Sequence, residues 1–356
     1  MSPPPAEAAR SRPIRVKVMS KTPPRVWRHQ LPTGNPVWGN CLFLFDRDER
    51  NYDWLVVYDD LPARSGERFT LRQEVLGGAP QHTLLVTTEP SSIKIYGSAY
   101  TAQFGCVLTS QDAWALPHPD RIFSQPALHW FYGVGREYER PFDEIAAAAP
   151  PAKTAELSMV FSDKRQRHTL HSRRFRFMQG LREALPEMEV YGRGVRPLDD
   201  KAEAVDAFRY HIAIENYLGP HHWTEKLADP FLGYALPFYA GCPNAAEYFP
   251  PQSFIPIDTA DLQGAVRIIR TAIRDGEYER RLPHIIEARR RVVEEYNLFA
   301  VLSREIAARH QPGAGAAGSV LLSRHLMRRK FPLRGGLRYM FEKARGRVIH
   351  ATLRGR

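Results

Sequence analysis

The fold predicted for the chain depends on residues 208–258, which read FRYHIAIENYLGPHHWTEKLADPFLGYALPFYAGCPNAAEYFPPQSFIPID. Thr224 is a good helix N-cap, because its side chain can accept a hydrogen bond from a free backbone amide. Apolar runs of four to seven residues, bounded by turn-forming residues, predict buried strands. Strands that alternate with helices indicate an α/β domain with a parallel sheet. Three such strands are predicted here: Tyr210–Ile214, Leu236–Ala240 and Ser253–Ile257.

The preceding half of the chain has the same pattern. Residues 67–75 predict a helix, and the alanine–proline run at 146–151 predicts a linker. We therefore expect a disordered N-terminus (1–13), an N-terminal Rossmann-like domain (14–145), a C-terminal Rossmann-like domain (155–310) and a basic tail (319–356). Ligands of such sheets bind at the carboxyl ends of the strands. The strands predicted in the first domain are Ile14–Met19, Trp38–Phe45, Tyr52–Tyr58, Thr83–Val86 and Phe104–Leu108.

The charge of the chain is concentrated in its last residues. Of the formal net charge of +11, residues 319–356 carry +10, so the two domains together are nearly neutral. In this tail Phe331, Leu337 and Met340 alternate with Arg and Lys, a pattern typical of binding to an anionic membrane surface. No stacking motif accompanies the basic residues, so nucleic acid is not an expected partner.

Composition also predicts a location. Three widely spaced cysteines favour a reducing compartment. The first residues lack the apolar core of a signal peptide, and no run approaches the roughly 20 apolar residues of a membrane-spanning helix. We expect a cytoplasmic protein that lies peripherally on the inner membrane face. A truncation after Gly318 is then expected to abolish vesicle binding and to leave catalysis on soluble substrates intact.

Residues 208–258 resemble the donor-binding signature of glycosyltransferase family 10, the α-1,3-fucosyltransferases. That signature runs F-x-x-x-x-E-N-S, Y-x-T-E-K, P-x-x-x-G and P-x-x-S-F-I. The chain departs from it at Tyr210 for Phe, Tyr217 for Ser and His222 for Tyr. The resemblance covers residues 155–260 well and the N-terminal half loosely, and it is closest to soluble bacterial members. The matching residues are Glu215–Asn216, Thr224–Lys226, Pro237 with Gly241, and Pro250 with Ser253–Ile255.

The resemblance implies the GT-B fold, in which two Rossmann-like domains face a cleft. It implies inverting transfer of L-fucose from GDP-fucose to a hydroxyl of a glycan, either GlcNAc-containing or a lipopolysaccharide O-antigen. Two alternatives stay open: a related transferase that uses another GDP-sugar, and a catalytically silent protein that binds glycans or membranes. No tightly bound cofactor or metal is expected, and divalent cations are expected at most to stimulate.

The resemblance also assigns the donor-binding residues. Lys226 and Arg174 are implied to contact the pyrophosphate, where cations stabilise the leaving diphosphate; Arg173 competes with Arg174 for this role. Glu225 is implied to accept the ribose hydroxyls, and Asn216 to lie near the phosphates and the sugar. Residue chemistry alone would allow solvated surface cations and, for Glu225, an acid that the helix dipole favours in the first turn.

Three further assignments follow from shorter matches. Tyr191 and Gly192 resemble the start of a Y/F-G-R-G element that lines the nucleotide pocket, and His222 stands at a position that contacts the donor in relatives. Glu89 follows a predicted strand and lies in an element similar to the E-S-P of family members. It is the candidate general base, which takes the proton of the acceptor hydroxyl. The alternative for Glu89 is an exposed loop acid.

Overall fold

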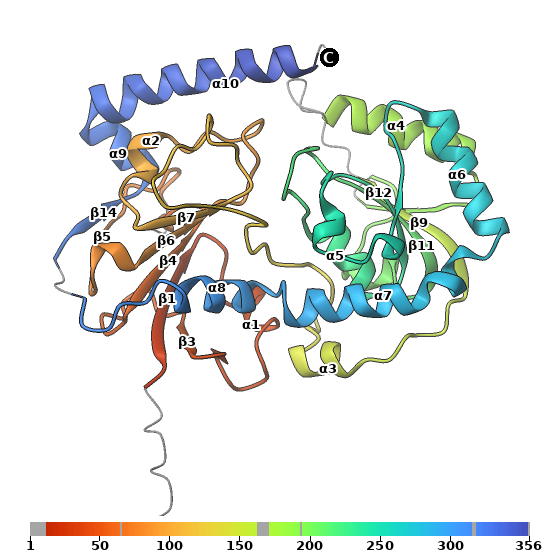
Figure 1. Ribbon diagram of the computed structural model, residues 1–356, viewed down its shortest axis with the longest axis horizontal. Coiled ribbons are helices and arrows are strands. Elements are labelled where there is room, and N and C mark those ends of the chain that lie inside the picture. The colour runs from red at the N-terminus through yellow and green to blue at the C-terminus, as the bar shows by residue number, and fades with distance from the viewer. Residues whose placement is uncertain (1–11, 65, 162–170, 193, 315–317, 355–356) are drawn as a thin grey trace, which may run out of the picture.

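The protein is described here from a computed structural model that covers residues 12–64, 66–161, 171–192, 194–314 and 318–354. Figure 1 shows two α/β lobes side by side, each built on its own sheet. The prediction of two α/β domains with parallel sheets, as in the GT-B fold, is confirmed. The disorder predicted for 1–13 falls mostly outside the described residues, as does part of the connection before the tail, residues 315–317.

The first sheet has seven strands in the order β2-β3-β1-β4-β6-β7-β8. All neighbours pair in parallel except β2, which is antiparallel to β3. The strands in the middle of the sheet are continuous apolar runs, as expected of a parallel sheet that is covered on both faces. The strands are β1 (Ile14–Ser20), β2 (Val37–Trp38), β3 (Cys41–Leu44), β4 (Trp54–Tyr58), β6 (Thr83–Val86), β7 (Cys106–Thr109) and β8 (Arg121–Phe123).

The second sheet has five parallel strands in the order β10-β9-β11-β12-β13. The strand expected at Leu236–Ala240 has these same bounds in the structure, and the others differ from expectation by a few residues. The short helix expected at 244–249 is a 3₁₀ turn, Ala245–Glu247. The strands are β9 (Ala155–Val160), β10 (Glu189–Tyr191), β11 (Phe208–Ile214), β12 (Leu236–Ala240) and β13 (Ile255–Pro256).

The helices that cover the second sheet begin where the sequence provides caps. Thr224 caps α5, its hydroxyl accepting from the amide of Lys226, and Asp261 caps α6. Each cap is worth about 1 kcal/mol. The main helices are α4 (His171–Ala184), α5 (Glu225–Leu232), α6 (Leu262–Arg274), α7 (Glu277–Glu294) and α8 (Leu298–Ala307); the shorter ones are α1 (Arg25–Arg28), α2 (Ser98–Thr101) and α3 (Phe142–Ala147).

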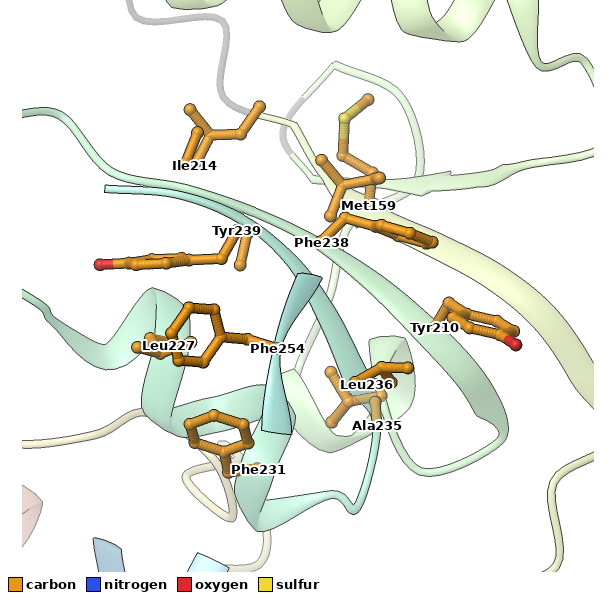
Figure 2. Close-up of a cluster of buried hydrophobic side chains, with 14 of the residues drawn as sticks. Met159, Tyr210, Ile214, Leu227, Phe231, Ala235, Leu236, Phe238, Tyr239 and Phe254 are labelled. Atoms are coloured by element: carbon orange, nitrogen blue, oxygen red, sulfur yellow. The ribbon is translucent and has the colours of Figure 1, made fainter. Parts of the chain in front are cut away.

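The core of the second domain is built from both faces of β12. Phe238 and Tyr239 are consecutive, so their side chains point away from each other (Figure 2). Phe231 of α5 packs against Phe249 with ring centroids 5.0 Å apart, and both belong to one buried cluster with Leu227 and Phe254 (Figure 2). Burying a side chain of this size contributes about 1.5–3 kcal/mol. This packing fixes α5, and with it Glu225 and Lys226, against the ends of the strands.

The predicted domain boundaries need correction at both ends of the second domain. Trp130, Tyr132 and Ile145, expected in the first domain, are buried in the core of the second. Helix α8, expected in the second domain, packs on the first sheet, where Phe299 meets Phe43 with ring centroids 4.7 Å apart. The chain therefore crosses between the domains twice. The sequence does not indicate the second crossing, from the second domain back to the first, because α7 and α8 follow each other in one helical region.

The tail is not a separate segment. Residues 73–75, expected in a helix, form strand β5 (Gln73–Val75), which pairs antiparallel with β14 (Val320–Leu322) of the tail. Leu321 is buried in the first domain. Cutting after Gly318 would remove this strand and expose that core, so such a truncation is now expected to disturb the first domain as well as the tail. The tail continues as α9 (Arg324–Lys330), a π-helical segment (Pro332–Leu337) and α10 (Arg338–Arg354). None of the described helices is both long and apolar enough to cross a bilayer.

Candidate donor site

A cavity of about 260 Å³ lies at the carboxyl end of β11, in the second domain. Four of the predicted donor-binding residues line it, and they come from three elements: α4, the loop after β11, and the start of α5. These four are Arg174, Asn216, Glu225 and Lys226. Arg174 precedes Asn216 by 42 positions and Asn216 precedes Glu225 by 9, and the fold brings them together.

Glu225 and Lys226 are the first two residues of α5 and form an ion pair of 2.6 Å. Burial alone would raise the pKa of Glu225, but the neighbouring ammonium outweighs it and brings that pKa to about 2. Burial opposes the charge of Lys226 as well, whereas Glu225 and Glu215 raise its pKa. Both groups are therefore charged at neutral pH, as a site for a ribose and a diphosphate requires.

Arg174 reaches the same cavity from α4. Its guanidinium donates to the side-chain oxygen of Asn216 and lies 3.5 Å from the carbonyl of Ile214, the last residue of β11. Burial lowers the pKa of Arg174, while the carboxylates of Glu215 and Glu225 raise it. Arg174 and Asn216 thus hold each other at the strand end. The side chain of the competing candidate, Arg173, lies outside the described residues.

Glu215 holds the start of α5 in place. It is buried at the end of β11, and its carboxylate accepts from the amide of Thr224 at 2.8 Å and from its hydroxyl at 2.7 Å. Lys226 Nζ lies 3.8 Å from it. Burial raises the pKa of Glu215, and Lys226 lowers it. Glu215 therefore joins β11 to the N-cap of α5, which makes it a positioning residue for Glu225 and Lys226.

Asp229 also lines the cavity, and sequence reasoning missed it. One carboxylate oxygen accepts from the amides of Phe131 and Tyr132 at 3.0 and 3.1 Å, and the other has no hydrogen-bond partner among the described residues. Burial raises the pKa of Asp229 to about 7. The only sequence signal was its position one helical turn after Glu225, which places both carboxylates on the same side of α5.

Tyr191 and Gly192 do not line this cavity. Tyr191 is buried, donates to Glu189 at 3.0 Å and carries the guanidinium of Arg196 over its ring at 4.6 Å. Gly192 has φ of 119°, and a Cβ there would lie 2.0 Å from the carbonyl oxygen of Phe161. The glycine is needed because two backbones approach closely at this point. These contacts give both residues a structural role beside β9.

His222 is also outside the cavity lining. It is buried, and its Nδ1 lies 3.0 Å from the hydroxyl of Ser110, directly after β7 of the first domain. Tyr217 packs edge-on against its ring at 5.5 Å. Burial lowers the pKa of His222 to about 3, so the imidazole is neutral. His222, one of the three residues that depart from the family pattern, therefore contacts the other domain.

Glu89 lies on the first domain, three residues after β6, and is half-buried. Its carbonyl accepts from Gln111 at 2.7 Å, which fixes the loop. Burial and the carboxylate of Asp59 raise the pKa of Glu89, whereas Lys94 and Lys226 lower it. Lys226 belongs to the second domain, so Glu89 lies within electrostatic reach of the donor cavity. Among the described residues, no group of three His, Cys, Asp or Glu is placed to hold a metal ion.

Paired cations, an amide and a carboxylate at the ends of parallel strands are typical of a domain that binds a nucleotide-sugar, as in glycosyltransferases. Residues 150–269 match the model of the C-terminal domain of glycosyltransferase family 10 (fucosyltransferase). This part of the chain is similar to that domain, and the resemblance seen in the sequence is confirmed over these residues.

Individual relatives also match parts of the chain. The 3-galactosyl-N-acetylglucosaminide 4-alpha-L-fucosyltransferase of Pan troglodytes is 35% identical over 95 residues, 25% of each chain. The alpha-(1,3)-fucosyltransferase of Helicobacter pylori is 31% identical over 58 residues, 16% of this chain and 12% of the relative. This chain thus spans about a quarter or less of these relatives. The crystal structure of an alpha1,3-fucosyltransferase aligns over 82% of this chain and 93% of that one, with 15% identity and a TM-score of 0.42.

Proposed function

We propose that the protein is an inverting fucosyltransferase that uses GDP-fucose. One observation carries the proposal: Arg174, Asn216, Glu225 and Lys226 converge on one cavity within the region that matches the family. The relatives' names supply the acceptor class, because they act on galactosyl-N-acetylglucosaminides. We take this GlcNAc-containing class as the first acceptor to test, with a lipopolysaccharide O-antigen as the second.

Each group has a role in this reaction. Lys226 and Arg174 stabilise the negative charge that develops on GDP as the bond to fucose breaks. Glu225 accepts hydrogen bonds from the ribose hydroxyls, and Asn216 donates to the phosphates or the sugar. Glu89 takes the proton of the acceptor hydroxyl as its oxygen bonds to the anomeric carbon. Attack opposite the leaving GDP inverts that carbon. Divalent cations would at most stimulate the reaction, by screening the negative charge of the diphosphate.

Thermal shift measurements with GDP, GDP-fucose, GDP-mannose, UDP and ADP test the donor. We expect GDP and GDP-fucose to raise the melting temperature, since a ligand that binds only the folded state stabilises it, by about 2.7 kcal/mol at a hundredfold excess over Kd. UDP and ADP serve as matched controls. A shift with UDP and none with GDP would contradict the proposal.

The same panel and a product assay separate the alternatives. A larger shift with GDP-mannose than with GDP-fucose would indicate another GDP-sugar as donor. Glycan binding without product in mass spectrometry would indicate a catalytically silent protein. Glu225 and Lys226 hold opposite charges at the cavity with side chains only 18% and 22% exposed, and shifted pKa values at such a cavity favour an active site.

Our proposal includes a location at the cytoplasmic face of an anionic membrane. One side of α10 and the residues before it expose large apolar side chains to solvent, with Met340 58%, Phe341 68% and Val348 64% exposed. Lys343, Arg345 and Arg347 are exposed between them. Apolar and basic residues combined in this way support attachment, with about 1 kcal/mol from each basic residue near an anionic leaflet.

Replacing both Met340 and Phe341 by Ser is expected to weaken sedimentation with phosphatidylglycerol vesicles by about tenfold or more, because two exposed apolar side chains could no longer enter the bilayer interface. The measurement uses the full chain, since β14 belongs to the first domain. Ile286→Ser, at an exposed position on α7, is the matched control and should sediment like the wild type. Equal sedimentation of the double variant would contradict the membrane assignment.

A further inference from the structure

The C-terminal helix α10 contacts the first domain along one side. Its contact residues, Tyr339, Glu342, Gly346 and His350, follow at intervals of three, four and four, which places them on one face of a helix. The opposite face holds the exposed apolar and basic residues. Figure 1 shows α10 passing across the top of the molecule, from above α9 and α2 toward the side of α4.

The contacts along this face are specific. Glu342 accepts from the backbone amide of Ser98 at 3.1 Å and from its hydroxyl. A Cβ at Gly346 would lie 3.2 Å from Ile95 and 3.7 Å from Trp114, so the glycine allows α10 to approach the loops of the first domain closely. The helix is therefore held in one register, and this register determines where His350 lies.

His350 is the contact residue nearest the end of α10, and it touches both domains. Its Nε2 lies 3.1 Å from the hydroxyl of Ser91, two residues after Glu89. Its ring packs edge-on against Trp114 of the first domain at 5.3 Å and against Tyr217 of the second at 6.3 Å. Tyr217 directly follows Asn216 of the donor site. His350 thus stands between the loop that carries the candidate base and the loop that carries a donor residue.

We propose that α10 closes the acceptor side of the cleft and that His350 is a specificity-determining residue. This inference rests on the proposed function. An acceptor whose hydroxyl reaches Glu89 must pass close to Ser91, Tyr217 and His350, because Ser91 is two residues from Glu89 and His350 contacts both Ser91 and Tyr217. The imidazole fills the gap between the two loops, so sugars beyond the reacting unit meet it. Short acceptors fit, and acceptors extended on that side are excluded while α10 is docked.

The test compares two acceptors in the full-length protein: a galactosyl-N-acetylglucosaminide disaccharide, and a tetrasaccharide that extends it. The measured quantity is the ratio of kcat/KM for the tetrasaccharide to kcat/KM for the disaccharide. We expect His350→Ala to raise this ratio by about tenfold or more, the size of effect that pocket sterics produce. His350→Gln, which keeps the polar group and most of the volume, should restore a ratio near that of the wild type.

Ala344→Ser, at an exposed position of the same helix, is the matched control and should leave the ratio unchanged. A merely structural His350 would lower transfer to both acceptors alike, and an unchanged ratio in His350→Ala overturns the inference. A wild-type protein that transfers fucose to neither acceptor overturns the proposed function, and the inference with it. Transfer by the wild type with an unaltered ratio in the variant overturns the inference alone.

Discussion

Glu89→Gln is expected to reduce fucose transfer by about 10²–10⁴-fold, the usual contribution of a general base, and to leave GDP affinity nearly unchanged. The amide keeps the shape of the side chain and its place after β6, but it cannot accept the proton of the acceptor hydroxyl. Glu89 does not line the donor cavity, so GDP should bind as before. Transfer rates at saturating GDP-fucose and GDP binding by calorimetry measure the two effects separately.

The pH dependence provides an independent test of the same role. Burial raises the pKa of Glu89, with Asp59 adding to the effect, and a base must be deprotonated to act. The value of kcat should therefore fall as pH decreases through this raised pKa, at a higher pH than for a solvent-exposed glutamate. The acid limb should be absent from the residual activity of Glu89→Gln.

Glu187→Gln, an exposed acid after α4, is the control and should behave as the wild type in both measurements. Turnover of Glu89→Gln close to that of the wild type would remove Glu89 as the base. A parallel loss of GDP affinity would show instead that the residue supports the donor site, through the electrostatic interaction with Lys226.

The donor-site residues at the start of α5 could be predicted because their sequence signals are local. Thr224, Glu225 and Lys226 are consecutive, so a helix cap and two charges appear as one short pattern. The strand before them is followed directly by Glu215, and the end of a parallel strand is where a ligand is expected. The helix dipole and the hydrogen bond of the cap act within a single turn, so sequence alone was sufficient for this part.

The remaining parts depend on contacts between distant segments. His222 meets Ser110, and His350 meets Ser91 and Tyr217, pairs that no periodicity or spacing could indicate. Nothing in the sequence distinguishes Asp229 from other helix residues. Its site becomes clear only from the backbone amides of Phe131 and Tyr132, which donate to it. The tail likewise has the sequence of a basic amphipathic segment. That it also contributes a strand to the first domain is seen only in the structure, where β14 pairs with β5.

Tyr191 and Gly192 show a different limit of prediction from sequence, the low specificity of a short motif. Their place in a short Y-G-R-G match suggested a nucleotide contact, whereas a glycine beside a strand end serves equally for close backbone packing. The structure shows such packing against Phe161. So short a pattern cannot distinguish a nucleotide contact from close backbone packing, because both require a residue without a Cβ. The T-E-K pattern left structural alternatives open as well, but it stands within a longer series of matching elements.

Lys226→Ala is expected to lower kcat/KM for GDP-fucose by about 10²–10³-fold and to weaken GDP binding as well, in contrast to Glu89→Gln. The ammonium acts on the diphosphate both when the donor binds and when it leaves. The substitution also removes the cation beside Glu225 and the buried Glu215. We therefore expect the free energy of unfolding to fall by about 1–3 kcal/mol, the cost of leaving a buried charged group without its partner.

Two further variants separate the loss of charge from the loss of stability. Lys226→Arg keeps a cation at the start of α5 and should retain more GDP affinity than Lys226→Ala. Arg267→Ala removes an exposed cation from α6, where its side chain is 73% exposed, and should leave binding and stability unchanged. Binding is measured by calorimetry at a temperature where all variants are folded. If Lys226→Ala bound GDP as tightly as the wild type there, Lys226 would be a structural partner of Glu215 and Glu225, and the diphosphate contact would pass to Arg174.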